Sequence, residues 1–236
     1  MPDRCPAILV TRPEPGASDT ATRIRALGFS AIVAPLLDVH PLESVLPPPS
    51  QVQAILATSA NAIAPIAPGY HHLPLFAVGR ATAARARAAG FLHVVSADGD
   101  ASALADLVGG RCDRTGQALL LAAGKGQAMP LAAALRSSGF RLFRRAVYAT
   151  VAVRPLPEPA RAALTAGCLG SALFFSAETA RHGVHLLVAA RLHEAVRTVD
   201  AVAIGQSAAV ALEALPWRRI RVAPWPNQEA MLALLQ

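Results

Sequence analysis

Short apolar runs alternate with helix-like stretches along almost the whole chain of 236 residues. Strands are expected at 7–11, 31–35, 54–58, 75–79, 93–96, 118–122, 144–150, 172–176, 201–205 and 220–223. Helices are expected at 18–27, 60–66, 82–89, 101–108, 129–138, 158–165, 178–190, 207–215 and 228–235. Strands that alternate with helices of this length are joined by right-handed crossovers, which place helices on both faces of a parallel sheet. The pattern therefore predicts an α/β fold with parallel sheets flanked by helices.

The same series of segments occurs twice in the chain. "ILATSANAIAPI" resembles "LFFSAETARHGV", and "AVGRATAARA" resembles "AIGQSAAVAL". "HVVSADGDASALADLV" resembles "IRVAPWPNQEAMLALL", and the stretch that opens with "ILVTRPEPG" resembles the one that opens with "LLLAAGKGQ". An Ala-rich α/β chain can align with itself through composition alone, but these pairs keep the same order in both halves. We therefore expect two similar lobes.

Two extended segments interrupt the alternation. They are "LLDVHPLESVLPPPS" and "RRAVYATVAVRPLPEP", and prolines flank both. Because proline restricts the backbone and ends helices, such segments are typical of linkers. We expect residues 37–41 and 145–151 to run side by side between the lobes.

The charge pattern narrows the class of ligand. The formal net charge is +7, Lys125 is the only lysine, and the arginines are scattered along the sequence. A nucleic-acid surface usually clusters basic residues with aromatic ones, and aromatic residues are only 5% here. Dispersed positive charge favours a cleft for a small polyanion.

The cysteines and the N-terminus indicate the compartment. Cys5, Cys112 and Cys168 are odd in number and form no C-x-x-C pair, which is typical of reduced thiols in a cytosolic protein. The N-terminus lacks a basic start followed by an apolar secretory segment. We expect a cytoplasmic protein without a membrane span.

Four strand ends lead through small polar residues into a helix. The stretches are Thr58-Ser59-Ala60-Asn61, Gly79-Arg80-Ala81-Thr82, Ser176-Ala177-Glu178-Thr179 and Gly205-Gln206-Ser207. Ligands of parallel sheets bind at the carboxyl ends of strands, and free N–H groups at helix starts bind anions. Any one of these residues is most simply a helix cap. Four at equivalent places in two lobes favour a shared anion-binding cleft.

Other motifs give less support for chemistry. The sequence contains no G-x-G-x-x-G, Walker or G-x-S-x-G motif. His182 and His185 have helical spacing for a shared metal, but no third ligand type matches them, so exposed helix residues are the better interpretation. Tyr148 lies in a linker, where it can pack or act as a weak acid.

With these segments in order, the chain resembles the uroporphyrinogen-III synthase family. The likeness rests on "ILVTRPEPG…RIRALGF", "VAPLLDVHPL", "ILATSANAI", "PLFAVGRATAARARAAGF", "AVYAT", "ALFFSAETA" and "AVAIGQSAAVAL". The resemblance implies a discontinuous first lobe of residues 1–37 and 151–236, a second lobe of 42–145, and a two-stranded connector of 37–41 and 145–151. At Gln206-Ser207 and Ala123-Gly124 the chain departs from the family pattern.

The resemblance also implies a reaction. Hydroxymethylbilane, a linear tetrapyrrole with eight carboxylates, would lose water and close into a ring with its terminal pyrrole inverted. The enzyme would be a monomer without cofactor or metal, would bind neither nucleic acid nor membrane, and would make transient contact with the enzyme that supplies its substrate. Tyr148 would assist departure of the hydroxyl as the catalytic residue. The substrate-binding residues would be Thr11, Arg12, Thr58, Ser59, Asn61, Gly79, Thr82, Ser176, Gly205, Gln206 and Ser207.

Two other classes of function fit parts of the sequence. A non-catalytic, two-lobed protein that binds an anionic small molecule would need the same lobes, linkers and cleft. A methyltransferase or dehydrogenase is less well supported, because the Gly-rich fingerprint of a nucleotide cofactor is missing.

Overall fold

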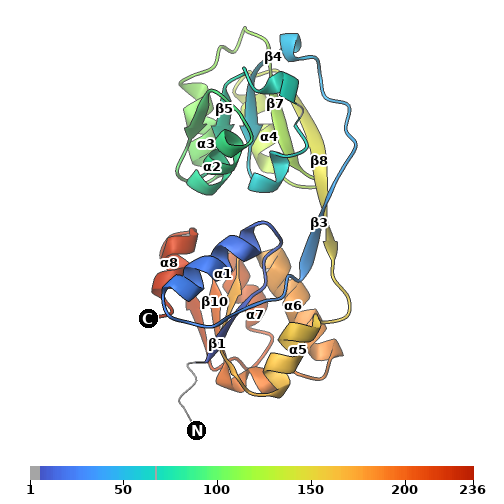
Figure 1. Ribbon diagram of the computed structural model, residues 1–236. Coiled ribbons are helices and arrows are strands. Elements are labelled where there is room, and N and C mark those ends of the chain that lie inside the picture. Colours follow the sequence, from blue (N-terminus) through green and yellow to red (C-terminus); the bar gives the residue numbers. More distant parts are fainter. Residues whose placement is uncertain (1–5, 67) are drawn as a thin grey trace. The chain divides into compact units, whose positions relative to one another are not determined.

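The computed structural model describes residues 6–66 and 68–236, which form two compact units (Figure 1). Unit 1 comprises the described residues up to Asp38 together with Val151–Gln236, and unit 2 is Val39–Thr150. Cys5 lies outside the described residues. Each unit holds one sheet with helices on both faces, so the predicted α/β fold is confirmed.

Unit 1 is built on a five-stranded sheet in the order β11-β10-β9-β1-β2. The strands are β1 (Ala7–Val10), β2 (Ala31–Val33), β9 (Leu169–Phe174), β10 (Asp200–Ala203) and β11 (Arg219–Val222), and all their pairings are parallel. Because side chains alternate along a strand, Leu173 packs on one face of the sheet and Phe174 on the other.

The helices of unit 1 cover these two faces. On the Leu173 face lie α1 (Gly16–Ala26) and α8 (Gln228–Ala233). On the Phe174 face lie α5 (Glu158–Thr165), α6 (Ala177–Ala189), α7 (Gln206–Leu212) and the 3-10 helix η4 (Ala195–Thr198). With both faces covered, the residues of the central strands β1, β9 and β10 are almost all buried, as is typical of a parallel sheet.

Unit 2 is built on a six-stranded sheet in the order β3-β8-β7-β4-β5-β6. The strands are β3 (Leu37–Pro41), β4 (Val52–Ala57), β5 (Leu75–Ala77), β6 (Val94–Ser96), β7 (Ala118–Gly124) and β8 (Leu142–Ala152). One face packs against α2 (Arg80–Ala88) and the 3-10 helices η2 (Ala60–Ala62) and η3 (Pro68–Tyr70), and the other against α3 (Ala101–Gly109) and α4 (Met129–Ser137). A short η1 (Pro49–Gln51) precedes β4.

The two sheets confirm the internal repeat read from the sequence. The matched segments make β4, β5 and β6 correspond to β9, β10 and β11, and β7 correspond to β1. Read from one edge, the orders are β6-β5-β4-β7 in unit 2 and β11-β10-β9-β1 in unit 1. Corresponding strands therefore occupy corresponding places in the two sheets.

The two segments expected to be linkers are paired strands. β3 is the neighbour of β8 in the sheet, Leu42 N donates to Val147 O over 2.9 Å, and Val153 N donates to Leu36 O over 3.0 Å. Since one partner's number falls as the other's rises, β3 and β8 run antiparallel. Proline at position 41 is tolerated because β3 lies at the edge of the sheet.

One helix expected from the sequence is wrong. Residues 60–66 form only the short η2 (Ala60–Ala62) followed by turns. Pro65 lacks an N–H group and cannot continue a helical ladder, and Pro68 starts η3 instead.

Candidate functional site

In unit 1 the carboxyl ends of three neighbouring strands carry the predicted site residues. β9 lies between β1 and β10, and all three are parallel. Arg12 therefore follows β1 at the same sheet edge where Ser176 follows β9 and Gly205 follows β10.

Thr11 is a structural part of this edge. Its side chain is fully buried, and its hydroxyl donates to the carbonyl of Leu173 over 2.6 Å. This bond ties the end of β1 to β9. Any contact between Thr11 and a ligand would have to come from its backbone.

The guanidinium of Arg12 is held by side chains of unit 1. Its carbon atom Cζ lies 4.3 Å from the ring centre of Phe175, and Nη1 donates to Oε1 of Gln228 over 3.0 Å. Gly16 leaves room for it, because a Cβ at that position would lie 2.5 Å from Arg12 Nε. Arg12 is thus fixed from three sides.

Arg12 is half-buried and has no ion-pair partner within the described part of the chain. Burial lowers its pKa, while the more distant carboxylates of Asp19 and Glu14 oppose that change. A guanidinium stays protonated in proteins and carries five N–H donors. In Arg12 only Nη1 donates within the described residues, to Gln228 Oε1 and, over 3.5 Å, to Thr20 Oγ1. The remaining donors suit a carboxylate from outside the chain.

The helices after β9 and β10 begin in two different ways. Ser176 caps α6 with its own side chain, which accepts from Thr179 N over 3.1 Å. Gly205 precedes α7 in extended backbone, and a Cβ there would meet nothing within 4 Å. Gln206 and Ser207 are exposed, and their N–H groups come before the first internal hydrogen bond of α7, which Ala208 makes.

Unit 2 presents the same arrangement at the ends of β4 and β5. Ser59 caps η2 by accepting from Asn61 N over 3.3 Å, and Thr58, Ser59 and Asn61 are half-buried. Gly79 precedes α2 in extended backbone, and an added Cβ would again meet nothing within 4 Å. The side chain of Thr82 is buried under the first turn of α2, which leaves only its backbone available.

Gly79 and Gly205 thus share a property that packing does not explain. Neither has a left-handed backbone and neither touches a neighbour at its Cβ position, so the fold would accept a side chain at both. Glycine instead keeps the start of α2 and of α7 uncovered. Uncovered N–H groups at a helix start can bind an anion.

Tyr148 lies on β8, in register with Gly124 of β7. Its side chain is only 2% exposed and belongs to the core of unit 2. The phenol donates to Oε1 of Gln127 over 2.9 Å. The sequence analysis did not single out Gln127, although the segment "LLLAAGKGQ", which ends with it, belongs to the internal repeat.

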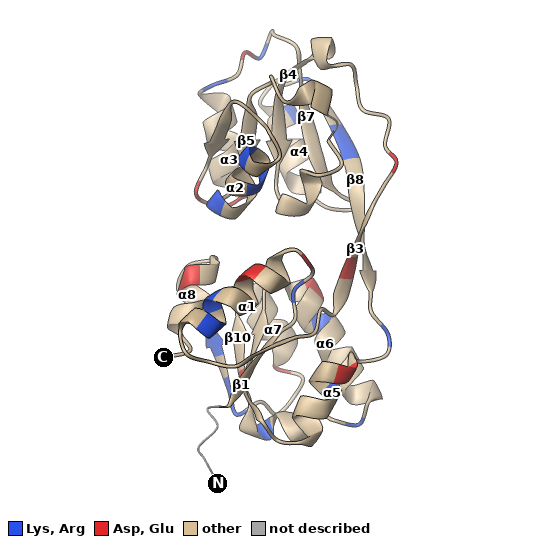
Figure 2. Cartoon of the chain, viewed as in Figure 1, with Lys and Arg blue, Asp and Glu red and all other residues tan. Residues whose placement is uncertain are grey.

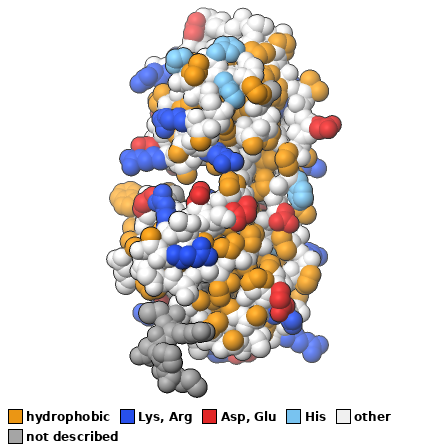
Figure 3. Space-filling model, in the orientation of Figure 1, with side chains coloured by type: hydrophobic (Ala, Val, Ile, Leu, Met, Phe, Trp, Pro, Cys, Tyr) orange, Lys and Arg blue, Asp and Glu red, His pale blue; other side chains and the backbone are white. Residues whose placement is uncertain are grey.

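The charges of the two units differ. By sequence, unit 2 has ten Lys and Arg against five Asp and Glu, whereas unit 1 has twelve against ten. Figure 2 shows basic residues distributed over several elements of each unit, and Figure 3 shows them dispersed on the visible face. Most of the net positive charge therefore belongs to unit 2.

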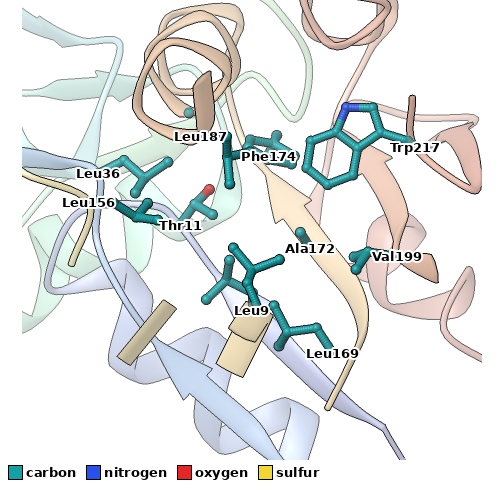
Figure 4. Close-up of a pocket in the computed structure, with 12 residues that line it drawn as sticks. Leu9, Thr11, Leu36, Leu156, Leu169, Ala172, Phe174, Leu187, Val199 and Trp217 are labelled. Atoms are coloured by element: carbon teal, nitrogen blue, oxygen red, sulfur yellow. The ribbon is translucent and has the colours of Figure 1, made fainter. Parts of the chain in front are cut away.

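Two hollows in the described part of the chain are lined neither by Arg12 nor by the four residues that precede the helix starts. A cavity of about 10 Å³ in the core of unit 1 is lined by apolar side chains such as Leu9, Phe174, Leu187 and Trp217 (Figure 4). At that size and polarity it is a dry packing gap. An open groove of about 480 Å³ lies beside Ala118, at the start of β7.

The structure was also searched for metal ligands and for membrane-spanning helices. His182 Nε2 lies 2.8 Å from the carbonyl of Val153, and in residues 6–66 and 68–236 no three His, Cys, Asp or Glu side chains group as metal ligands would. Within those same ranges, no helix is both long enough and apolar enough to cross a membrane.

Comparisons with known proteins identify the family and the fold. The family model described as Uroporphyrinogen-III synthase HemD matches residues 18–233. A uroporphyrinogen-III synthetase structure from Helicobacter pylori superposes with a TM-score of 0.62 at 16% identity and covers 97% of each chain, which shows the same fold. A mutant uroporphyrinogen III synthase from Thermus thermophilus gives a TM-score of 0.48 at 20% identity over 96% of each chain. A search of curated proteins gave no match.

The family model thus spans almost all of both units, including the strand ends that carry Ser59, Gly79, Ser176 and Gly205. The chain therefore belongs to the uroporphyrinogen-III synthase family, the cyclising hydro-lyases of tetrapyrrole biosynthesis.

Proposed function

We propose that this chain binds hydroxymethylbilane through uncovered N–H groups and Arg12 at the carboxyl ends of its parallel strands and closes it to uroporphyrinogen III. The observation that carries the proposal is the pair of open glycines, Gly79 and Gly205, at corresponding helix starts. A substrate with eight carboxylates needs many donors, and backbone N–H groups supply them without a matching number of cationic side chains.

Each edge would contribute differently to binding. Unit 1 offers the guanidinium of Arg12 and the N–H groups of Gln206 and Ser207. Unit 2 offers the N–H groups that follow Ser59 and Gly79, and it carries the larger excess of positive charge. Ser59 and Ser176 act in this proposal mainly as caps that hold the helix starts in place.

Ring closure can give two isomers. Loss of the hydroxyl leaves a cation on the first pyrrole, and the last pyrrole can attack it through either its free or its substituted α-carbon. Attack by the substituted carbon, through a spiro intermediate, gives the inverted type III ring. The protein's task is then to hold the chain in the conformation that favours this attack. We assign Tyr148 as the group that donates a proton to the departing hydroxyl.

A non-catalytic relative that only binds an anionic tetrapyrrole is the alternative. Uncatalysed closure gives the type I ring, so the product isomer separates the two functions. The assay mixes purified protein with freshly generated hydroxymethylbilane, oxidises the products and separates the isomers. Predominant type III product supports the proposal, whereas binding that leaves only type I product supports the alternative.

Variants at the open glycines test the site itself. Gly79→Val and Gly205→Val should each weaken substrate binding, because the added side chain covers the helix start. Gly109→Val is the matched control, since Gly109 also has free space at its Cβ position but ends α3 instead of preceding a helix. Equal activity in all three variants would contradict the proposed site.

The proposal extends to the oligomeric state, the compartment and the supply of the substrate. We expect a monomer in the cytoplasm that receives its unstable substrate from the enzyme that makes it. Gel filtration of the purified chain tests the first of these points.

A further inference from the structure

We propose that Gln127 is a positioning residue that fixes the phenol of Tyr148 for proton donation. The inference rests on the proposed function of Tyr148 and goes beyond it, because Gln127 has no assigned role. The two side chains meet at the carboxyl end of β7, where Tyr148 Oη lies 2.9 Å from Gln127 Oε1.

The backbone of Gln127 is held firmly. Arg144 donates to its carbonyl through both Nε, over 2.9 Å, and Nη2, over 2.7 Å. Its own N–H donates to the carbonyl of Gly124 over 3.0 Å, and Lys125 N donates to the carbonyl of Tyr148 over 2.8 Å. The loop and β8 are therefore locked together on both sides of the amide–phenol contact.

Gly124 supplies the space that the contact needs. A Cβ on Gly124 would lie 2.7 Å from Gln127 Oε1 and 2.9 Å from Cε2 of the Tyr148 ring. The glutamine could move aside, but the ring is packed in the core of unit 2. Glycine at this position thus keeps both side chains in one arrangement.

A glutamine suits a phenol that loses and regains its proton. Its amide oxygen accepts from the neutral phenol, and after a flip its NH2 group can donate to a phenolate. In the proposed step the phenol O–H turns from Gln127 Oε1 to the departing hydroxyl, its proton passes to that oxygen, the C–O bond breaks and water leaves. The proton that the last pyrrole later loses, as it regains aromaticity, returns to the phenolate. Protons and charge then balance over the cycle.

Gln127→Glu separates accepting from the phenol from donating to the phenolate. A carboxylate accepts from the phenol but cannot donate to a phenolate, and its charge disfavours the phenolate. Gln127→Glu should therefore raise the pKa of Tyr148 and slow type III formation. Gln127→Leu removes both functions with little change in size.

The closing experiment is a double-mutant cycle with Gln127→Leu and Tyr148→Phe, in which the rate of type III formation is measured. Each single variant should lose about tenfold or more in rate, and the double variant should lose no more than Tyr148→Phe alone. Tyr70→Phe is the matched control, because Tyr70 is the other buried tyrosine of unit 2 and donates to a backbone carbonyl.

A spectroscopic readout separates positioning from general stability. The chain has two tyrosines, so in a Tyr70→Phe background Tyr148 alone reports ionisation by ultraviolet difference absorbance. Gln127→Glu should move that titration to higher pH, whereas an unchanged titration would overturn the inference.

The outcomes separate a failure of the proposed function from a failure of the positioning role of Gln127. No type III product from the unaltered protein defeats the proposed function. Full activity of Tyr148→Phe defeats the role of the phenol, and the positioning inference with it. Impaired Tyr148→Phe beside unimpaired Gln127→Leu, or fully additive losses in the double variant, overturns the positioning inference alone.

Discussion

Removing the charge of Arg12 should damage function while sparing the fold. The guanidinium is half-buried against Phe175 without an ion-pair partner among the described residues, so the folded protein bears the cost of burying it. In Arg12→Met that cost disappears, while stacking on Phe175 and the hydrogen bonds to Gln228 and Thr20 are lost. We expect these effects to offset one another, with a change in unfolding free energy below about 1 kcal/mol.

The expected functional loss is larger. Hydrogen bonds to charged groups contribute about 1.5–3 kcal/mol, which corresponds to about 10- to 150-fold in substrate affinity. Gly16→Ala should give part of the same loss, because its Cβ would lie 2.5 Å from Arg12 Nε and the guanidinium must move by about 1 Å to reach contact distance. Since Gly16 starts α1, alanine there should not weaken the helix.

Isomer-resolved kinetics and urea unfolding test this prediction together. Arg12→Met and Gly16→Ala should raise KM, and the combined variant should match Arg12→Met. Arg25→Met is the control, because Arg25 is an exposed arginine in the last turn of the same helix. A loss of more than about 2 kcal/mol in stability with unchanged KM would show that Arg12 serves only to tie the segment after β1 to α8.

Three further predictions concern stability and capping. Asp200 is buried and bonded to Arg218 over 2.7 Å, which lowers its pKa. The ionised Asp200 therefore stabilises the fold fully at neutral pH. This stabilisation is lost as the pH falls below about 3.9, the pKa of an unfolded aspartate, and through the lower pKa of Asp200 in the folded protein. In Asp200→Asn the free energy of unfolding should depend less on pH in this acidic range. Gly183→Ala should destabilise unit 1 by about 1–3 kcal/mol in denaturant unfolding, because its Cβ would lie 3.0 Å from the Phe174 ring. Ser176→Ala should cost about 1 kcal/mol of stability and at most about tenfold in activity, and a thousandfold loss with intact folding would mark the hydroxyl as chemical.

Much of the fold could be predicted from the sequence because it depends on local pattern. Apolar runs bounded by glycine and polar residues gave the strands, and the repeated order gave the matching sheets. The helix expected at 60–66 was wrong because Pro65 outweighed the helix-like composition around it. Pairing of β3 with β8 was foreseen only as two linkers running side by side.

The candidate site was predictable at the level of backbone and less so at the level of side chains. Gly79 and Gly205 were found because a strand, a glycine and a helix follow one another in the sequence. The burial of Thr11 and Thr82 depends on which way a side chain turns at a strand end or in a first helical turn. Gln127 was missed because its contact with Tyr148 joins a loop to a separate strand, which sequence spacing does not reveal.

The discontinuity of unit 1 has a consequence for how the protein is made. β1 is buried along its whole length and lies between β2 and β9, yet β9 is synthesised only after the whole of unit 2. During translation, unit 2 is a continuous stretch that can fold while β1 still presents an apolar, unpaired edge. Such an edge favours aggregation, and closing so long a loop makes the last pairing slow. The nascent chain should therefore depend on a holding chaperone from the emergence of β1 until Leu169–Phe174 leaves the ribosome.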